Sequence, residues 1–353
     1  MRFGTFFFFQ APPGHRHADI IRRELEQIEW TEELGFDEAW LTEHHFIEYG
    51  LSVDPASLAA AAASRTRRIR IGLAAAILPF HHPLRLAEQM ALVDIISSGR
   101  LDVGVGRGNR PAEFRGYRVP QEQSRDRFDE AVEIMMRAWT EERFAYDGRF
   151  FQVPELSVIP KPVQQPHPPL YQVCVSKDGI ENTALRGWPM LNSVLFGPVQ
   201  QLVGNRDTYV ETLRKAGRSA EEVAALLGRW GVSRQIYVAD TDARALADTK
   251  DAELWYQESF RRFVIPDRID EAHPTLQPGF RAMAERLAKV TWEGLVRETL
   301  AFGSPDTVAR HIATMRDLGV GQVMCWMNFG GLAQDKVRRS MELFAREVMP
   351  RFR

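Results

Sequence analysis

The sequence predicts an α/β fold, namely a (β/α)8 TIM barrel with insertions. Short runs rich in β-branched and aromatic residues alternate with longer amphipathic runs along the 353 residues. This alternation is typical of parallel strands joined by helices. The strand candidates number eight, which is the number that closes such a barrel. Polar residues follow several of these strands at their carboxyl ends, where a barrel keeps its active site.

The expected elements follow one another in βα order. The strand candidates, all short apolar runs, are 2–9, 37–42, 69–78, 100–106, 170–176, 189–194, 233–239 and 322–327. The helix candidates, all longer amphipathic runs, are 17–35, 55–64, 83–97, 124–141, 178–186, 200–216, 242–262, 305–318 and 332–348. Capping residues mark some helix starts, such as Asp54 before Pro55 and Ser124 before a charged stretch.

Two segments are longer than ordinary connections. Segment 142–169 is rich in proline and is expected to be a surface excursion. Segment 264–300 is charged and contains three prolines, and it is expected to form a lid over the barrel mouth. Neither segment has the character of a domain linker, so one domain is expected over residues 1–353.

Charge and cysteine usage narrow the class of protein. The 45 basic and 47 acidic side chains are well mixed and give a formal net charge of −2, so neither nucleic acid nor an anionic membrane is an expected partner. No stretch approaches the ~20 apolar residues of a membrane helix. Cys174 and Cys325 lie far apart in apolar runs, where buried free thiols are expected rather than a disulfide. A soluble enzyme of the cytoplasm is the expectation.

The strand candidate 37–42 runs directly into Glu43, His44 and His45. Imidazoles titrate near neutrality, and the carboxyl end of a barrel strand is where catalysis takes place. We therefore expect His44 to be catalytic, with His45 and Glu43 as further candidates. The alternative is one core histidine hydrogen-bonded to a carboxylate and one exposed histidine. Adjacent side chains of an extended chain point apart, and no zinc-type spacing occurs, so no metal site is expected.

A glycine-rich segment ends the strand candidate 100–106. Gly106 and Gly108 flank Arg107, and such a segment lets a flat ring or a phosphate approach the backbone closely. The arginine can bind a phosphate with two hydrogen bonds. The spacing is not that of a dinucleotide-binding fingerprint, and Pro111 follows instead of a clean helix start. The alternative is a glycine-rich turn with a solvated arginine.

Two further places suggest contacts with a bulky anionic ligand. Ser176 and Gly179 lie where a strand candidate passes into a helix, and the free N–H groups of a helix start bind anions; ordinary N-capping by Ser176 is the alternative. Arg125 near another helix start is a second cation. Ala74 and Ala75 lie in the middle of a strand candidate, where small side chains leave room for a bulky group.

In this order, these segments resemble the bacterial luciferase-like, flavin-dependent monooxygenases, and among them the luciferase α-chain branch. The segments that match are M-R-F-G at 1–4, G-F-D-E-A-W-L-T-E-H-H-F at 35–46, I-G-L-A-A-A-I-L-P at 71–79, H-P-L-R-L-A-E at 82–88, S-G-R-L-D-V-G-V-G-R-G at 98–108, R-G-W-P-M at 186–190 and V-M-P-R-F at 348–352. The similarity extends over essentially the whole chain.

The resemblance implies an enzyme that uses reduced FMN, supplied by a separate flavin reductase, and O2 to oxidise a carbonyl or other organic substrate. It implies an acid–base role for His44 and a non-proline cis peptide between Ala74 and Ala75, beneath the flavin ring. The residues that match phosphate-binding positions are Arg107, Arg125, Ser176 and the backbone near Gly179.

The chain departs from the luciferase α-chain at two cofactor-binding positions. Val175 replaces a glutamate and Gly106 replaces a cysteine, so light emission is not expected to transfer. Two other functions remain open: hydride transfer with a deazaflavin coenzyme, and a flavin-binding subunit without catalysis. The resemblance also implies a homodimer, formed through the alanine-rich stretch 56–63 and the helix candidate 83–97.

Overall fold

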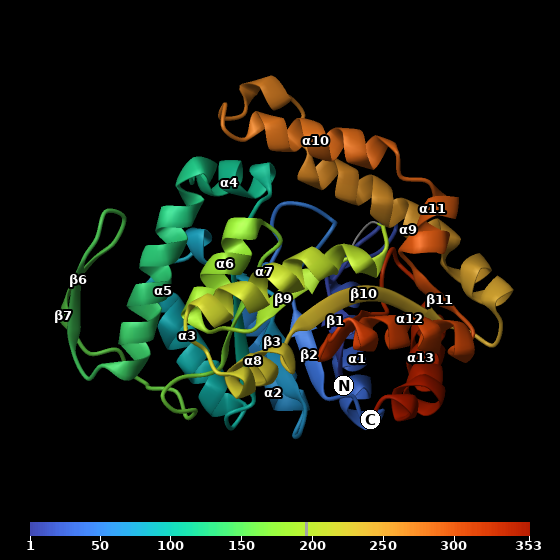
Figure 1. Cartoon of the computed structure of the whole chain (residues 1–353), viewed down its shortest axis with the longest axis horizontal. Coiled ribbons are helices and arrows are strands. Elements are labelled where there is room, and N and C mark those ends of the chain that lie inside the picture. The colour runs from blue at the N-terminus through green and yellow to red at the C-terminus, as the bar shows by residue number, and fades with distance from the viewer. Residues whose placement is uncertain (195–196) are drawn as a thin grey trace.

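Eight parallel strands close into a barrel in the computed structural model, which describes residues 1–194 and 197–353 (Figure 1). Each strand pairs with the next, and the last pairs with the first. The barrel strands are β1 (Arg2–Phe7), β2 (Glu38–Leu41), β3 (Arg70–Leu73), β5 (Leu101–Gly106), β8 (Leu170–Val173), β9 (Met190–Ser193), β10 (Gly231–Val238) and β12 (Gln322–Trp326). The predicted (β/α)8 TIM barrel is confirmed.

Helices surround the barrel as an outer layer (Figure 1). Those near their predicted positions are α1 (His17–Glu33), α2 (Pro55–Arg65), α3 (Pro83–Ile96), α5 (Ser124–Thr140), α6 (Lys177–Arg186), α7 (Leu202–Lys215), α9 (Asp242–Val264), α12 (Pro305–Asp317) and α13 (Gln334–Leu343). The predicted Asp54 cap of α2 is confirmed, because its carboxylate accepts from the amides of Ala56 and Ser57. The predicted Ser124 cap is wrong: Gln123 precedes α5, and its side chain makes no capping bond.

Other elements were not predicted, mostly because they are short. The additional helices are α4 (Pro111–Tyr117), α8 (Ala220–Leu227), α10 (Gln277–Ala288) and α11 (Trp292–Glu298). Unpredicted single helical turns cover Leu78–Phe80, Gln121–Gln123, Ile269–Glu271 and Met349–Arg351, whereas the turns at Val199–Gln201 and Phe344–Val348 fall at the ends of the helix candidates 200–216 and 332–348. A short strand, β11 (Ala301–Gly303), pairs with the outer part of β10.

The strand predicted over 69–78 is interrupted. β3 ends at Leu73, the peptide between Ala74 and Ala75 is cis, and β4 (Ala76–Ile77) then pairs with the end of β5. Gly104 of β5 lies so close to β3 that a Cβ there would stand 1.9 Å from the carbonyl oxygen of Leu73. The chain therefore bends at the alanine pair, at the carboxyl end of the barrel.

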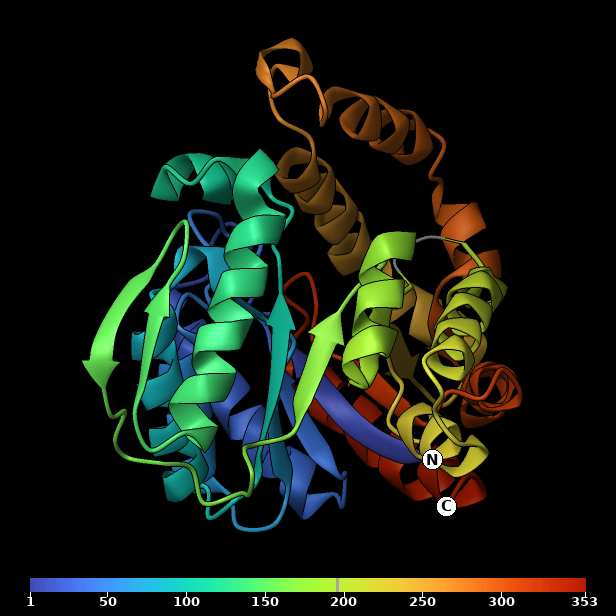
Figure 2. The ribbon, with the colours of Figure 1, turned by 60° about the vertical axis from the view of Figure 1, so that its left-hand side comes forward.

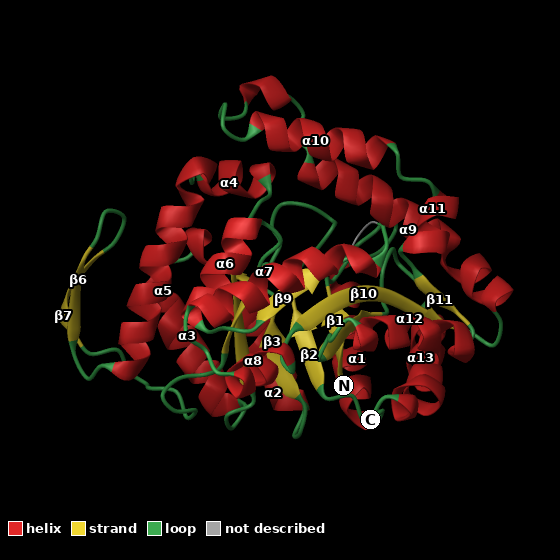
Figure 3. Cartoon of the chain, viewed as in Figure 1, coloured by secondary structure: helices red, strands yellow, loops and turns green. Residues whose placement is uncertain are grey.

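The two long insertions lie on different sides of the barrel. Segment 142–169 contains an antiparallel hairpin, β6 (Phe144–Asp147) and β7 (Gln152–Leu156), which lies at the outer edge next to α5 (Figure 3). Segment 264–300 contains α10 and α11, which follow α9 along the chain. α10 stands above the barrel mouth with its start near α4, and α11 lies beside α9 on the side away from α4 (Figures 1 and 2). The position of α10 is the one that a lid over the barrel mouth would occupy.

Both cysteines are buried and free, as predicted. Burial raises the pKa of the Cys174 thiol to about 12 and that of Cys325 well above its usual value. Such thiols stay protonated and unreactive at neutral pH. Within the described residues, no helix combines the length and the apolar composition needed to cross a bilayer.

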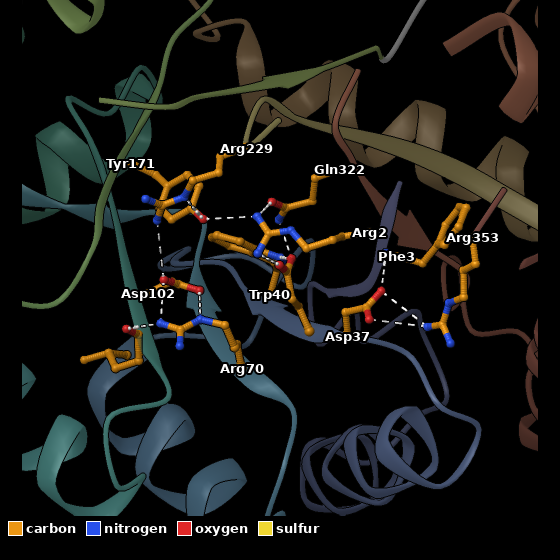
Figure 4. Close-up of polar contacts among 12 residues, drawn as sticks. Arg2, Phe3, Asp37, Trp40, Arg70, Asp102, Tyr171, Arg229, Gln322 and Arg353 are labelled. Atoms are coloured by element: carbon orange, nitrogen blue, oxygen red, sulfur yellow. Dashed lines mark hydrogen bonds and ion pairs between the residues drawn. The ribbon is translucent and has the colours of Figure 1, made fainter. Parts of the chain in front are cut away.

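A buried polar network closes the amino-terminal end of the barrel (Figure 4). Asp102 accepts two hydrogen bonds from the Arg70 guanidinium, at 2.6 and 2.8 Å, and Arg229 lies 3.9 Å from the same carboxylate. Arg229 also donates to the Tyr171 hydroxyl at 3.1 Å, and Arg2 donates to the side chain of Gln322 at 2.7 Å. These contacts fill the amino-terminal end of the barrel with paired charges.

We expect Asp102→Asn to lower the free energy of unfolding by about 3 kcal/mol, because it leaves two arginines without their buried partner. Urea denaturation measures this change. Glu155→Gln is the matched control, since Glu155 forms an exposed ion pair with Arg143 at 3.3 Å and such pairs contribute less than about 1 kcal/mol. Equal free energies of unfolding for the two variants would show that Asp102 does not stabilise this end of the barrel. Ligand binding at the other end should be unchanged in both.

Candidate active site

A cavity of about 290 Å³ opens at the carboxyl ends of the barrel strands. It joins the end of β2, the bend after β3, the end of β5 and the start of α6. The predicted site residues that line it are Glu43, His44, Ala74, Ala75, Gly106, Arg107, Arg125, Val175, Ser176 and Gly179. His45 is not among the lining residues. The geometry thus brings the expected catalytic histidine and the expected phosphate-binding arginines into one cavity.

His44 is held on several sides. Its ring stacks on Phe8, with centroids 5.6 Å apart and an angle of 12° between the planes. Tyr49 and Phe263 meet the ring edge-on, each at 5.2 Å. Its Nδ1 lies 3.1 Å from a carboxylate oxygen of Glu113. Because the side chain is only 13% exposed, packing and this bond fix the orientation of the imidazole.

The charge state of His44 follows from this environment. Burial lowers its pKa below the usual value, and the Glu113 carboxylate only partly opposes this effect. The imidazole is therefore neutral at pH 7. A carboxylate can only accept, so Nδ1 carries the hydrogen and Nε2 keeps a free lone pair. The arrangement makes His44 a base at neutral pH.

Glu113 is a positioning residue in this arrangement, and Glu113→Gln tests that role. Glu113 raises the pKa of His44, so removing its charge lets that pKa fall further and moves the acidic limb of the kcat profile to lower pH. We expect kcat itself to fall roughly tenfold, since a hydrogen bond to a charged group contributes about 1.5–3 kcal/mol. The measurement is kcat from about pH 5 to pH 8.

The control for this variant is Glu48→Gln, because Glu48 is an exposed carboxylate on the same loop as His44. An unchanged pH profile in Glu113→Gln would remove the positioning role. A purely structural defect would lower kcat without moving the acidic limb.

Glu43 and His45 interact with each other and with neighbouring residues. The Glu43 carboxylate lies 2.9 Å from His45 Nε2 and 2.8 Å from His81 Nε2, and it accepts from the amide of Ile77 at 2.8 Å. Burial alone would raise the Glu43 pKa, but these hydrogen bonds lower it below its usual value. His45 Nδ1 lies 2.9 Å from the Tyr117 hydroxyl. The geometry makes Glu43 an anchor for the segment Ala76–Ile77, and a catalytic role for either residue stays a prediction.

The opposite end of the cavity is cationic. Arg125 lies 3.4 Å from Asp178, and both side chains are exposed. Arg186 pairs with Asp129 at 2.5 Å and donates to Gln172. In contrast, no described residue forms an ion pair or hydrogen bond with the Arg107 guanidinium.

The surroundings of Arg107 favour an anion. Desolvation of the partly enclosed guanidinium is the main cause that lowers the Arg107 pKa, and the nearby charge of Arg125 lowers it further. The start of α6 faces the same cavity, with its Ser176 hydroxyl accepting from the Gly179 amide at 3.3 Å. Ser176 therefore acts as an N-cap, the alternative considered above, while it also lines the cationic end. A phosphate would neutralise this charge and meet the helix dipole.

Between the two ends the wall is nearly free of side chains. Ala74 and Ala75 form the predicted cis peptide. A Cβ on Gly106 would lie 3.2 Å from the Cβ of Ala75, and one on Gly108, where φ is +75°, would lie 2.8 Å from the side chain of Ile77. The backbone is thus the surface that a ligand meets here, and a flat ring fits such a surface.

Aromatic residues line the end near His44. Phe6 and Phe8 line the cavity, and the Trp326 ring stacks on Phe8, with centroids 4.3 Å apart. The nearby Phe46 does not belong to this wall: its side chain is 64% exposed and packs on Tyr117. Its backbone has φ +66°, which turns the ring outward.

Sequence reasoning missed two charged residues of the site, Arg110 and Glu113. Glu113 belongs to α4, which begins at Pro111, and Arg110 immediately precedes this helix. The expectation that no clean helix start follows Arg107 is therefore wrong. Proline at the first position of a helix is a known start signal, and it could have identified α4. The partner of Glu113 could not have been found in this way, because His44 lies 69 residues earlier.

Comparison with known proteins agrees with this geometry. The chain matches the family described as Luciferase-like monooxygenase over residues 1–322. It therefore belongs to the luciferase-like monooxygenases, and the resemblance seen in the sequence is confirmed.

Two relatives and one solved structure illustrate the match. An alkanal monooxygenase alpha chain from Photorhabdus luminescens is 27% identical, over 99% of this chain and 96% of that protein. The oxygenase component of a flavin-dependent trigonelline monooxygenase from Acinetobacter baylyi is 24% identical, over 100% of this chain and 96% of that protein. The crystal structure of a monooxygenase from Streptomyces bottropensis has a TM-score of 0.84 at 28% identity, covering 100% of both chains.

Proposed function

We propose that this chain is the oxygenase of a two-component system that uses reduced FMN and O2 to oxidise a small or medium organic substrate containing a carbonyl group. The observation that supports this most is a single cavity containing both the neutral His44 and the unpaired Arg107. A proton-transfer group at one end and an anion site at the other are what this reaction requires of the protein.

FMN suits the residues present. Arg107, Arg125 and the start of α6 would hold its single phosphate. The ring would lie along the wall formed by Ala74–Ala75 and Gly106, where no side chain extends beyond Cβ. When bound, the reduced flavin supplies the electrons that activate O2. A separate reductase delivers it, in line with the relative whose name marks it as an oxygenase component.

His44 provides the proton chemistry of the reaction. Glu113 keeps the hydrogen on Nδ1, so Nε2 accepts a proton from the substrate or its hydrate and later returns it. Phe8 and Tyr49 fix the ring so that this lone pair keeps one direction. Glu43 and His45 support this group, because their hydrogen bonds fix the bend that follows β3.

Water exclusion is the third requirement, because an activated oxygen species is lost to hydrolysis and stray protons. The aromatic wall keeps the His44 end dry. Segment 264–300 acts as the lid, since α10 stands above the mouth (Figure 2). Its helices are joined to the site through Phe263 at the end of α9, which contacts His44.

Reconstitution tests the proposed reaction. The purified chain is supplied with NADH, FMN, an FMN reductase and either decanal or 2-decanone under ¹⁸O₂. We expect one labelled oxygen atom in the product and the other in water, and no labelled product when the chain is omitted.

Two outcomes would favour a different function for this chain. Activity only with a reduced deazaflavin, independent of O2, would indicate hydride transfer. No flavin-dependent oxidation over a broad substrate panel would indicate a flavin-binding subunit without catalysis.

The homodimer is part of the same proposal. Its predicted face includes α3, where three apolar side chains are exposed: Leu92 at 51%, Ile95 at 39% and Ile96 at 42%. Such a group on one helix favours burial against a second copy. Size-exclusion chromatography with light scattering should give the mass of two chains for the wild type. Leu92→Glu with Ile96→Glu should give the mass of one chain, and an unchanged mass would exclude this face.

A further inference from the structure

Arg110 introduces an unpaired charge at the His44 end of the cavity. It immediately precedes α4, lines the cavity and is half-buried. Its guanidinium lies over the rings of Phe260 and Phe263, with 5.1 and 5.0 Å between its central carbon and the ring centroids. Its Nε is buried and has no hydrogen-bond partner. No acidic side chain in the described part of the chain forms an ion pair with it.

The nearest acidic residue along the chain is already engaged elsewhere. The same oxygen of Glu113 that faces His44 Nδ1 also accepts from the amide of His45 at 3.0 Å. Two other cavity arginines, Arg125 and Arg186, have carboxylate partners. Because a partly buried charge without an acidic partner is costly, the environment of Arg110 favours an anionic ligand.

The contacts of Arg110 leave donors free for such a ligand. Both rings lie within the distance at which cation–π attraction holds the guanidinium. No described residue accepts a hydrogen bond from the two Nη groups, so their N–H donors stay available to a ligand. A carboxylate binds a guanidinium with two parallel hydrogen bonds.

We propose that Arg110 binds a carboxylate of the substrate, so that the enzyme acts on a carbonyl compound that also bears a carboxylate. The inference rests on the proposed function, because it specifies the substrate of that site. The apolar body of the substrate lies among Phe6, Phe8 and Tyr49, with its carbonyl near His44. Arg107 remains the phosphate ligand at the other end.

Binding to the full chain without flavin tests this assignment independently of any oxygenation. The probes are two matched acid–amide pairs, 4-acetylbenzoate with 4-acetylbenzamide and 8-oxononanoate with 8-oxononanamide, measured by calorimetry. We expect the wild type to bind at least one acid about tenfold or more tightly than its amide, as a charge-assisted bidentate contact gives. Arg110→Met should lose that preference, and Arg110→Lys should keep part of it.

Arg107→Met shows at which end the acid binds, because it alters only the cationic end. The preference for the acid should survive in this variant. Loss of the preference in Arg107→Met but not in Arg110→Met would place the carboxylate at the phosphate site and overturn the proposal. Absence of any acid preference in the wild type, or equal weakening of acid and amide in Arg110→Met, would also overturn it. Equal weakening would mean that Arg110 contributes only to the packing of α9, through its contacts with Phe260 and Phe263. Thermal unfolding of each variant confirms that it is folded.

Discussion

Replacing His44 with alanine should lower substrate oxidation by roughly 100- to 10,000-fold, the range that a positioned acid–base group contributes. Reduced-flavin binding should stay within about twofold, since the phosphate is held at the other end of the cavity. The expectation follows from the neutral imidazole, whose Nδ1 faces Glu113 at 3.1 Å and whose Nε2 is left as the base.

The pH profile provides the independent readout for this variant. Burial lowers the pKa of His44 below its usual value, so the wild-type kcat should fall only when the pH drops through that lowered pKa and protonates Nε2. His44→Ala should lack this limb, and added imidazole should restore part of the rate. His17→Ala, at an exposed histidine on α1, is the control and should match the wild type. Unchanged turnover in His44→Ala would remove the assigned role.

Replacing Arg107 with methionine should weaken FMN binding by about 10- to 100-fold, because a hydrogen bond to a charged group contributes about 1.5–3 kcal/mol. The comparison with riboflavin makes this test specific, since riboflavin has the same ring without the phosphate. The wild type should prefer FMN, and Arg107→Met should bind the two flavins nearly equally.

Flavin fluorescence titration measures this preference. Arg85→Met removes an exposed arginine of α3 and should leave the preference intact. The FMN contact should also weaken as salt rises, because ions screen the charge. If Arg107→Met kept the full preference for FMN, the phosphate would have to bind elsewhere, and the cationic end would lose its assigned purpose.

The barrel could be predicted from the sequence because its signals are local. A buried strand such as β5 is an apolar run bounded by turn residues. A helix such as α3 has proline at its first position and buries Leu86 and Met90, spaced four residues apart, against the barrel. These signals need no knowledge of distant residues. The same holds for the polar residues after β2 and β5, because parallel strands place all their carboxyl ends at one edge.

The missed features depend on contacts between distant segments. Nothing local shows that the strand over 69–78 breaks at the alanine pair. The family resemblance indicated a cis peptide at this pair, but not that the strand ends there. The interruption accompanies the close approach of Gly104 to Leu73. β11 has three residues and depends on pairing with β10. Glu113 acquires its role only when α4 packs beside the end of β2.

The central claim is that one cavity holds FMN with its phosphate at Arg107 and its ring beside the cis alanine pair, within reach of His44. A crystal structure of the chain with FMN tests this most directly. We expect the phosphate in contact with Arg107 and Ser176 and the ring against Ala74–Ala75. A flavin whose phosphate lies away from Arg107, or whose ring lies in a cavity that His44 does not line, would contradict the account.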